Sequence, residues 1–114
     1  MARHVPPQLK NLFVFASNRE FAHKPGLIVA VSSGMGGAYP VAELRMSSYK
    51  NTRIVWLPDH VIIRKVESFG DGSVDDVRLH DRLRKSVQIL AEYAVRMTDL
   101  RDSVGDLLKL GSGM

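Results

Sequence analysis

The sequence predicts an α/β domain in which helices pack on a short parallel sheet. Apolar and amphipathic segments alternate in the order helix, strand, helix, strand, helix, and strands that are joined through helices run parallel. The first predicted strand is apolar throughout, which is typical of a strand covered on both faces. The chain has 114 residues, enough for one domain, and its hydrophobic content of 45% argues against disorder. We therefore treat residues 1–114 as a single domain.

The N-terminal element is expected to be a helix that begins at Pro6 and Pro7, because proline is tolerated in a first helical turn. Apolar side chains then recur at the i, i+3, i+4, i+7 spacing of one helix face. They are Leu9, Leu12, Phe13 and Ala16. The polar residues 17–24 are expected to end this helix, and Pro25-Gly26 mark the entry to the first strand.

The first strand is expected over residues 27–31, and a Ser/Gly-rich loop follows it. A helix is then predicted over residues 39–50, with Asn51 at its end. Its inward side chains are expected to be Val41, Leu44 and Tyr49. A second strand is expected over residues 53–57, followed by extended residues 61–63. Because Pro58 lacks an N–H group, the strand should reach a sheet edge or a break there.

The last helix follows a turn-rich segment, residues 68–76, and either Asp75 or Asp76 is expected to cap it. Apolar side chains spaced by four and three residues predict its inward face. They are Leu79, Leu83, Val87, Leu90, Ala94 and Met97. The helix is expected to continue to Leu108 or to break near Gly105, and its charged side to be solvated.

The number of predicted strands is too small for an independent sheet, since three or more strands are normally needed. We therefore expect either that the chain is the second half of a larger fold or that it completes its sheet with another copy. An unpaired strand edge is a template for pairing, so the sequence predicts a homo-oligomer, joined by a swapped element or edge to edge.

Several classes of protein are disfavoured. The chain has no cysteine, which excludes disulfides and thiolate sites, and its four histidines lack metal-ligand spacing, so no metal site is expected. No Ser/His/Asp or paired-carboxylate signature marks a catalytic residue. A net charge of +4 with interleaved acids disfavours nucleic acid as a partner. No apolar run reaches about 20 residues, so no membrane span is expected, and a cytoplasmic protein is the default.

The candidate binding site is the loop between the first strand and the second helix. It consists of Ser32, Ser33, Gly34, Met35, Gly36 and Gly37. Glycines let a ligand approach the backbone, and ligands in α/β proteins bind where strands give way to helices. The glycine pattern alone favours a tight turn without a ligand. Outside the loop, Trp56 is expected in the core or an interface, and Arg45 and Arg53 on the solvated surface.

The order of several short motifs resembles the C-terminal half of the NAD(P)H-dependent FMN reductase family. The motifs are PPQLKN at residues 6–11, FAHKP at 21–25, SSGMGGA at 32–38, Leu44-Arg45, Leu57-Pro58 and FGDG at 69–72. The resemblance implies a partial flavodoxin-like fold, a doubly wound parallel sheet that lacks its N-terminal strands, with FMN at the carboxyl ends of the strands. It further implies that NAD(P)H reduces FMN, which then reduces a small-molecule electron acceptor.

The resemblance also implies a deficit, because the family's phosphate-binding G-S-x-R-x-x-S loop and its P-E-Y-N-G loop have no counterpart in residues 1–114. We therefore expect a truncated reductase that binds FMN weakly or is inactive as this chain. The alternative is a non-catalytic α/β module that oligomerises through its sheet edge or its helices.

Overall fold

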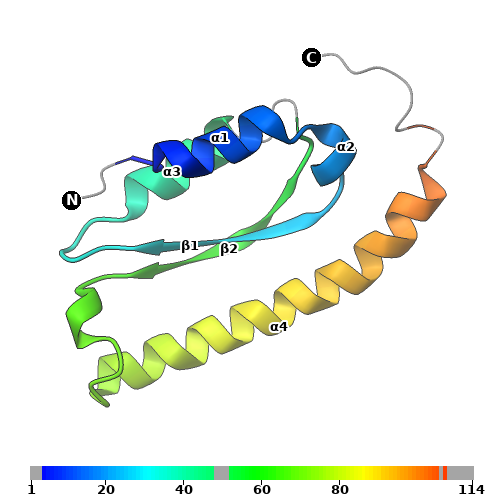
Figure 1. Cartoon of the computed structure of the whole chain (residues 1–114). Helices are drawn as coiled ribbons and strands as arrows, with labels where there is room; N and C mark the ends of the chain where they lie inside the picture. Colours follow the sequence, from blue (N-terminus) through cyan, green and yellow to red (C-terminus); the bar gives the residue numbers. More distant parts are fainter. Residues whose placement is uncertain (1–3, 48–51, 106, 108–114) are drawn as a thin grey trace.

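A computed structural model describes residues 4–47, 52–105 and 107 of the chain. Two helices lie on one side of a two-stranded sheet and a long helix lies on the other (Figure 1). The elements are α1 (Pro7–Phe15), α2 (Asn18–Phe21), β1 (Pro25–Val31), α3 (Ala38–Ser47), β2 (Val55–Ile63), the 3-10 turn η1 (Val66–Ser68) and α4 (Val74–Ser103). The predicted α/β class, a partial flavodoxin-like unit with a short parallel sheet, is confirmed.

Strands β1 and β2 pair in parallel, as the alternation of elements predicted. The register places Gly26 opposite Trp56 and Ile28 opposite His60, so two steps along β1 match four along β2. The extra residues form a bulge that contains Pro58, which confirms the break expected there. The prediction of a strand over residues 53–57 is corrected, because β2 begins at Val55 and runs through the bulge to Ile63.

The core lies between the sheet and the helices α1 and α3. Its buried residues are Val5, Ile28, Ala30, Val41 and Leu44, with Phe13, Trp56 and Ile62 packed against them. The inward positions Val41 and Leu44 are therefore confirmed. In the described residues α3 begins at Ala38 and ends at Ser47, while the predicted positions Tyr49, Lys50 and Asn51 lie outside the described residues.

Helix α4 covers the other face of the sheet, where Leu57, Val61 and Ile63 are buried. Four predicted inward residues are partly buried: Leu79, Leu83, Leu90 and Met97. The prediction is wrong for Val87 and Ala94, which are exposed, whereas Ser86 is buried and Tyr93 partly buried. The described sheet has two strands, so it covers a narrower strip of α4 than the apolar stripe predicted from the sequence. Residues at the margin of that stripe therefore remain exposed.

The narrow sheet also corrects the expectation that the first strand is covered on both faces. Val29 and Val31 are 43% and 54% exposed, although Ile28 and Ala30 on the other face are buried. Val29 lies opposite Val61, which is fully buried under α4. The α4 face of the sheet is therefore covered along β2 and half open along β1.

Side-chain capping fixes the starts of α2 and α4, and only part of it was predicted from the sequence. Helix α2 was missed, although Ser17 and Glu20 form a capping box at its start. Helix α4 is capped by Ser73, whose hydroxyl accepts from the Asp76 N–H group, so the prediction of an aspartate cap is wrong. Its end at Ser103 agrees with the predicted break near Gly105.

Candidate functional site

The predicted binding loop, residues 32–37, lies at the carboxyl end of β1 and leads directly into α3. Ser32 and Gly37, at the two ends of the loop, are buried. Ser33, Met35 and Gly36 are exposed and Gly34 is partly buried. The loop therefore presents its middle residues to the outside and is anchored at both ends.

The carbonyl groups of the loop are held by the segment that follows β2. Val66 N–H donates to the Ser32 oxygen over 3.1 Å, and Lys65 N–H donates to the Gly34 oxygen over 3.0 Å. The Arg64 guanidinium donates from Nε to the Met35 oxygen over 2.8 Å. Residues 64–66 thus hold the loop only through its carbonyl groups. The N–H groups of the loop need other hydrogen-bond partners.

The donors of the loop are used at its start and left open further along. Ser32 N–H donates to the Ile63 oxygen over 2.8 Å, and Gly34 N–H donates to the Ser32 hydroxyl over 3.2 Å. Among the described hydrogen bonds, none uses the N–H groups of residues 35–37. Consecutive open N–H groups before a helix N-terminus are suited to an anionic or electron-rich acceptor.

The two glycines at the end of the loop serve different purposes. Gly37 has a φ of 114°, and a Cβ there would lie 2.5 Å from Ile62 Cγ2, so the fold itself requires glycine. A Cβ on Gly36 would lie 3.4 Å from the Ser32 hydroxyl oxygen, at the short end of ordinary van der Waals contact. Gly36 is therefore the position at which glycine serves access to the backbone.

A cavity of about 380 Å³ adjoins the loop. It is lined by Met35 of the loop, by Arg64 and Lys65 after β2, and by residues of the turn before α4 and of the first turns of α4. This volume is at the lower end of the range for small-molecule sites. Arg64 and Lys65 were not among the predicted site residues. They follow β2 as the loop follows β1, and the carboxyl ends of parallel strands meet at one edge of the sheet, which is the signal that could have identified them.

Asp76 lines this cavity and orders the turn before α4. Its carboxylate accepts from the N–H groups of Gly70 and Gly72 over 2.7 and 3.1 Å, and His80 Nε2 lies 3.3 Å away. The Gly70 N–H group above all, with Gly72 and His80, lowers the pKa of Asp76 against the opposing effect of burial. The His80 ring stacks on Phe69 with centroids 4.3 Å apart. The turn is therefore ordered by one buried carboxylate.

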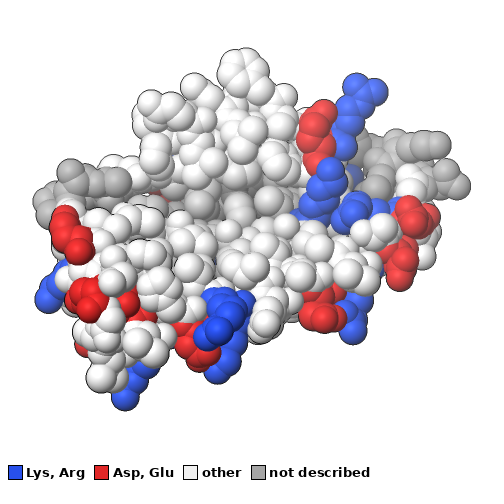
Figure 2. Space-filling view, turned by 60° about the horizontal axis from the view of Figure 1, so that its bottom comes forward, with Lys and Arg blue, Asp and Glu red and all other residues white. Residues whose placement is uncertain are grey.

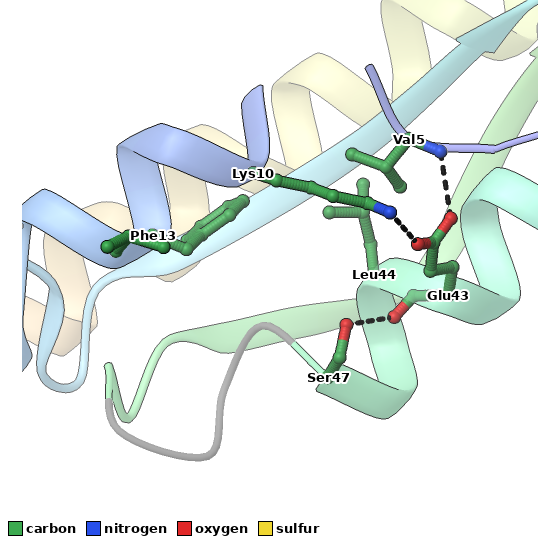
Figure 3. Close-up of a pocket in the computed structure, with 7 residues that line it drawn as sticks. Val5, Lys10, Phe13, Glu43, Leu44 and Ser47 are labelled. Atoms are coloured by element: carbon green, nitrogen blue, oxygen red, sulfur yellow. Dashed lines mark hydrogen bonds and ion pairs between the residues drawn. The ribbon is translucent and has the colours of Figure 1, made fainter. Parts of the chain in front are cut away.

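A second cavity, also of about 380 Å³, lies between α1 and α3, away from the strand ends (Figure 3). The Glu43 carboxylate at its centre accepts from the Lys10 ammonium over 2.6 Å and from Val5 N–H over 2.8 Å. Lys10 first, then the Val5 N–H group, lowers the pKa of Glu43. These groups pair with one another, so they tie the N-terminal segment and α1 to α3.

The other candidates of the sequence analysis lie away from the loop. Trp56 packs in the core, edge-on to Phe13 at 6.3 Å, as expected. Arg45 is not a solvated surface residue, because its guanidinium donates to the carbonyl groups of the β2 bulge. Arg53 precedes β2 with a φ of 55° and is partly buried. Within the described ranges, no cluster of three His, Asp or Glu side chains could hold a metal ion.

The fold places the chain among α/β proteins with a parallel sheet, a class in which ligand sites generally lie at the carboxyl ends of the strands. The profile of the NADPH-dependent FMN reductase family matches residues 2–68, more than half of the chain, and the chain belongs to this family. No curated protein matches the sequence. In the described part of the chain, no helix is both long enough and apolar enough to cross a membrane.

Proposed function

We propose that this member of the FMN reductase family binds a flavin through the loop of residues 32–37. The observation that carries the proposal is the set of N–H groups at Met35, Gly36 and Gly37 that no described hydrogen bond uses, next to a cavity of about 380 Å³ that Met35 lines. The carbonyl groups of the same loop are already bonded to residues 64–66. A ligand at this loop therefore meets donors, as the acceptor-rich pyrimidine edge of a flavin ring requires.

Bound FMN would supply the redox chemistry, accepting a hydride from NAD(P)H and passing electrons to an acceptor such as a quinone, a metal ion or an azo compound. The role of the chain is to bind and orient the ring. The N–H groups of residues 35–37 would donate to the ring edge that becomes electron-rich on reduction. The Met35 side chain, 68% exposed and lining the cavity, would contact the ring.

The loop favours the flavin ring over the FMN phosphate. The cations that line the cavity are Arg64 and Lys65, and three aspartates line it as well, so its charge does not favour a phosphate. We therefore propose that this chain recognises the ring, and that FMN and riboflavin bind with similar affinity.

Titration of the purified chain with FMN and with riboflavin, followed by quenching of flavin fluorescence, tests the proposal. Both flavins are expected to bind, and Gly36→Val is expected to weaken both about tenfold or more, because branched carbons then stand where the ring approaches the backbone. Gly105→Val is the matched control, since a Cβ on Gly105 makes only ordinary contacts at 3.6 Å. Flavins that do not bind, or that bind equally to both variants, would contradict the proposal.

A second candidate function is a non-catalytic module that assembles through its sheet edge. The exposed Val29 and Val31 on β1 favour it, because an apolar strand edge in water is an assembly surface. The two candidates are separable, because flavin binding needs the strand ends and assembly needs the side of the sheet.

A further inference from the structure

One edge of β1 pairs with no strand among the described residues. Ser32 N–H donates to Ile63 of β2, so the backbone of Ser32 points toward β2. Because successive residues of a strand alternate in direction, the N–H and C=O groups of Val31 and Val29 point to the free edge. Their side chains are 54% and 43% exposed on the α4 face. The free edge of β1 is therefore apolar and equipped for pairing.

The outer edge of β2, in contrast, is protected against pairing. It contains Pro58, which has no N–H group to donate, and the bulge around it. The guanidinium of Arg45 lies 2.8, 3.1 and 3.3 Å from the carbonyl oxygens of residues 57–59. Arg82 donates to the His60 oxygen over 3.1 Å. The molecule thus blocks one edge of its sheet and leaves the other open.

Between residues 80 and 98, the flank of α4 next to the open edge carries no Asp, Glu, Lys or Arg. Since Arg82 reaches β2, the opposite flank of α4 faces the free edge of β1. At about 100° per residue, that flank consists between residues 80 and 98 of His80, Val87, Ala91, Ala94 and Thr98. Figure 2 shows a broad uncharged area on this side of the molecule, bordered by a margin of interleaved acidic and basic side chains. Val87 and Ala94, which the sequence pattern placed inward, belong to this flank.

We infer that the free edge of β1 and the uncharged flank of α4 pair with the same surface of a second copy of this chain. Identical edges can pair only across a two-fold axis, which makes the two β1 strands antiparallel. The result is a continuous sheet in the order β2, β1, β1, β2, with both α4 helices on one face. Val29, Val31, Val87 and Ala94 are then covered.

The spacing of strands and helices fits this arrangement. Helix α4 contacts both strands, so its axis lies over the sheet between them. At about 4.8 Å per strand, two such helices would lie about 10 Å apart across the two-fold axis. Packed helices are normally separated by about 8–10 Å, and small side chains at the contact favour that distance. Ala91 and Ala94 supply them.

The positions of β1 and α4 along the strand direction also agree with this dimer. Arg101 Nη1 donates to the His23 oxygen over 3.2 Å, which fixes α4 relative to the start of β1. The chain from His23 to Val29 spans about 20 Å, a length that corresponds to about 13 residues of helix. Val29 therefore lies beside the part of α4 near residue 88, so strand pairing centred on Val29 also brings Val87 and Ala91 to the axis.

The surface of the chain is large enough for such an interface. The whole chain has an accessible surface of 8029 Å², whereas a compact monomer of its mass, 12.7 kDa, exposes about 6,200 Å². The excess is larger than the roughly 800 Å² that each partner contributes to a standard interface. An interface of standard size would therefore fit within this excess.

Static light scattering of the purified chain across micromolar concentrations tests the inference. The expected mass is twice 12.7 kDa. Ala94→Glu is expected to raise the dissociation constant about tenfold or more, because each copy then buries a carboxylate in the uncharged contact between the two α4 helices. Val95→Glu is the matched control, since Val95 is 68% exposed on the outer side of α4, and the dimer is expected to persist. Val31→Lys tests the strand edge in the same way.

Circular dichroism establishes that each variant is folded. A chain that is monomeric at every concentration would overturn the inference, and so would a dimer that survives both Ala94→Glu and Val31→Lys. An edge that receives a different polypeptide leaves this chain monomeric and gives the first of these results. The mass is measured with and without FMN. A dimer that forms without flavin supports the inference even where flavin binding fails.

Discussion

Arg45 of α3 donates from its guanidinium to the carbonyl oxygen of Leu57 in β2 over 2.8 Å. The same nitrogen lies 3.1 and 3.3 Å from the carbonyl oxygens of Pro58 and Asp59. The bulge removes these groups from the regular ladder, and Leu57 itself is 1% exposed. Because an unpaired buried carbonyl group costs free energy, Arg45 stabilises the irregular point of the sheet while it fixes α3 above it.

Replacing Arg45 with alanine is expected to lower the free energy of unfolding by about 1–3 kcal/mol, the range for hydrogen bonds to a charged donor. Arg45→Lys should restore only part of the loss, because an ammonium lacks the planar fork of a guanidinium. Urea unfolding measures both. Arg96→Ala is the control, as Arg96 pairs with Glu92 on the solvent side of α4, and its loss should stay within about 0.5 kcal/mol. Equal losses for Arg45→Ala and Arg96→Ala would refute the role of Arg45.

The order of elements and the parallel pairing could be predicted because they depend on local patterns. The apolar run of β1 and the periodicity of α4 mark those elements without tertiary information. The depth of burial could not be predicted from the same patterns. Val87 and Ala94 fit an inward stripe in the sequence, yet they are exposed because the described sheet has no third strand beneath them.

The loop of the candidate site could be predicted because a continuous apolar run ends at Ser32 and a helix begins soon after. Its partners could not be predicted, because the register of β2 decides which residues meet the loop. Arg64 contacts Met35 across 29 positions of the sequence, and the bulge at Pro58 shifts that register by two residues. Helix α2 is different, since its capping box at Ser17 and Glu20 was visible in the sequence.

Asp76 is expected to make the turn before α4 sensitive to acid. Its pKa in the folded chain is lowered, chiefly by the Gly70 N–H group, below the ordinary value of 3.8. A lowered pKa contributes stability that is complete above the unfolded value and is lost as the pH falls through the folded value. Thermal unfolding between about pH 5 and pH 2 should therefore show a falling melting temperature, and Asp76→Asn should flatten that fall.

The neighbouring carboxylate provides the control for this prediction. Asp75 has a side chain that is 96% exposed and lies 3.9 Å from Arg78 at the surface of α4. Asp75→Asn is expected to leave the acid dependence unchanged. If both variants show the slope of the unmodified chain, Asp76 is not the group that couples the turn to pH.

Gly37→Ala is expected to be the most costly single change in the loop, for two separable reasons. Its φ of 114° is unfavourable for any residue with a Cβ, and that Cβ would lie 2.5 Å from Ile62 Cγ2. Gly70 shares the first property alone, with a φ of 92° and open space around it. We expect a loss of about 1–2 kcal/mol for Gly70→Ala and at least about 1 kcal/mol more for Gly37→Ala, measured by urea unfolding.

A double-mutant cycle separates the clash from the backbone strain. Shortening Ile62 removes the atom that the new Cβ would meet, so Gly37→Ala should cost less in an Ile62→Ala background than in the unmodified chain. The same cycle between Gly70 and Ile62 should be additive, because no atom lies within 4 Å of a Cβ on Gly70. Additivity at both glycines would show that Gly37 is needed for its backbone conformation and not for the packing of the loop on β2.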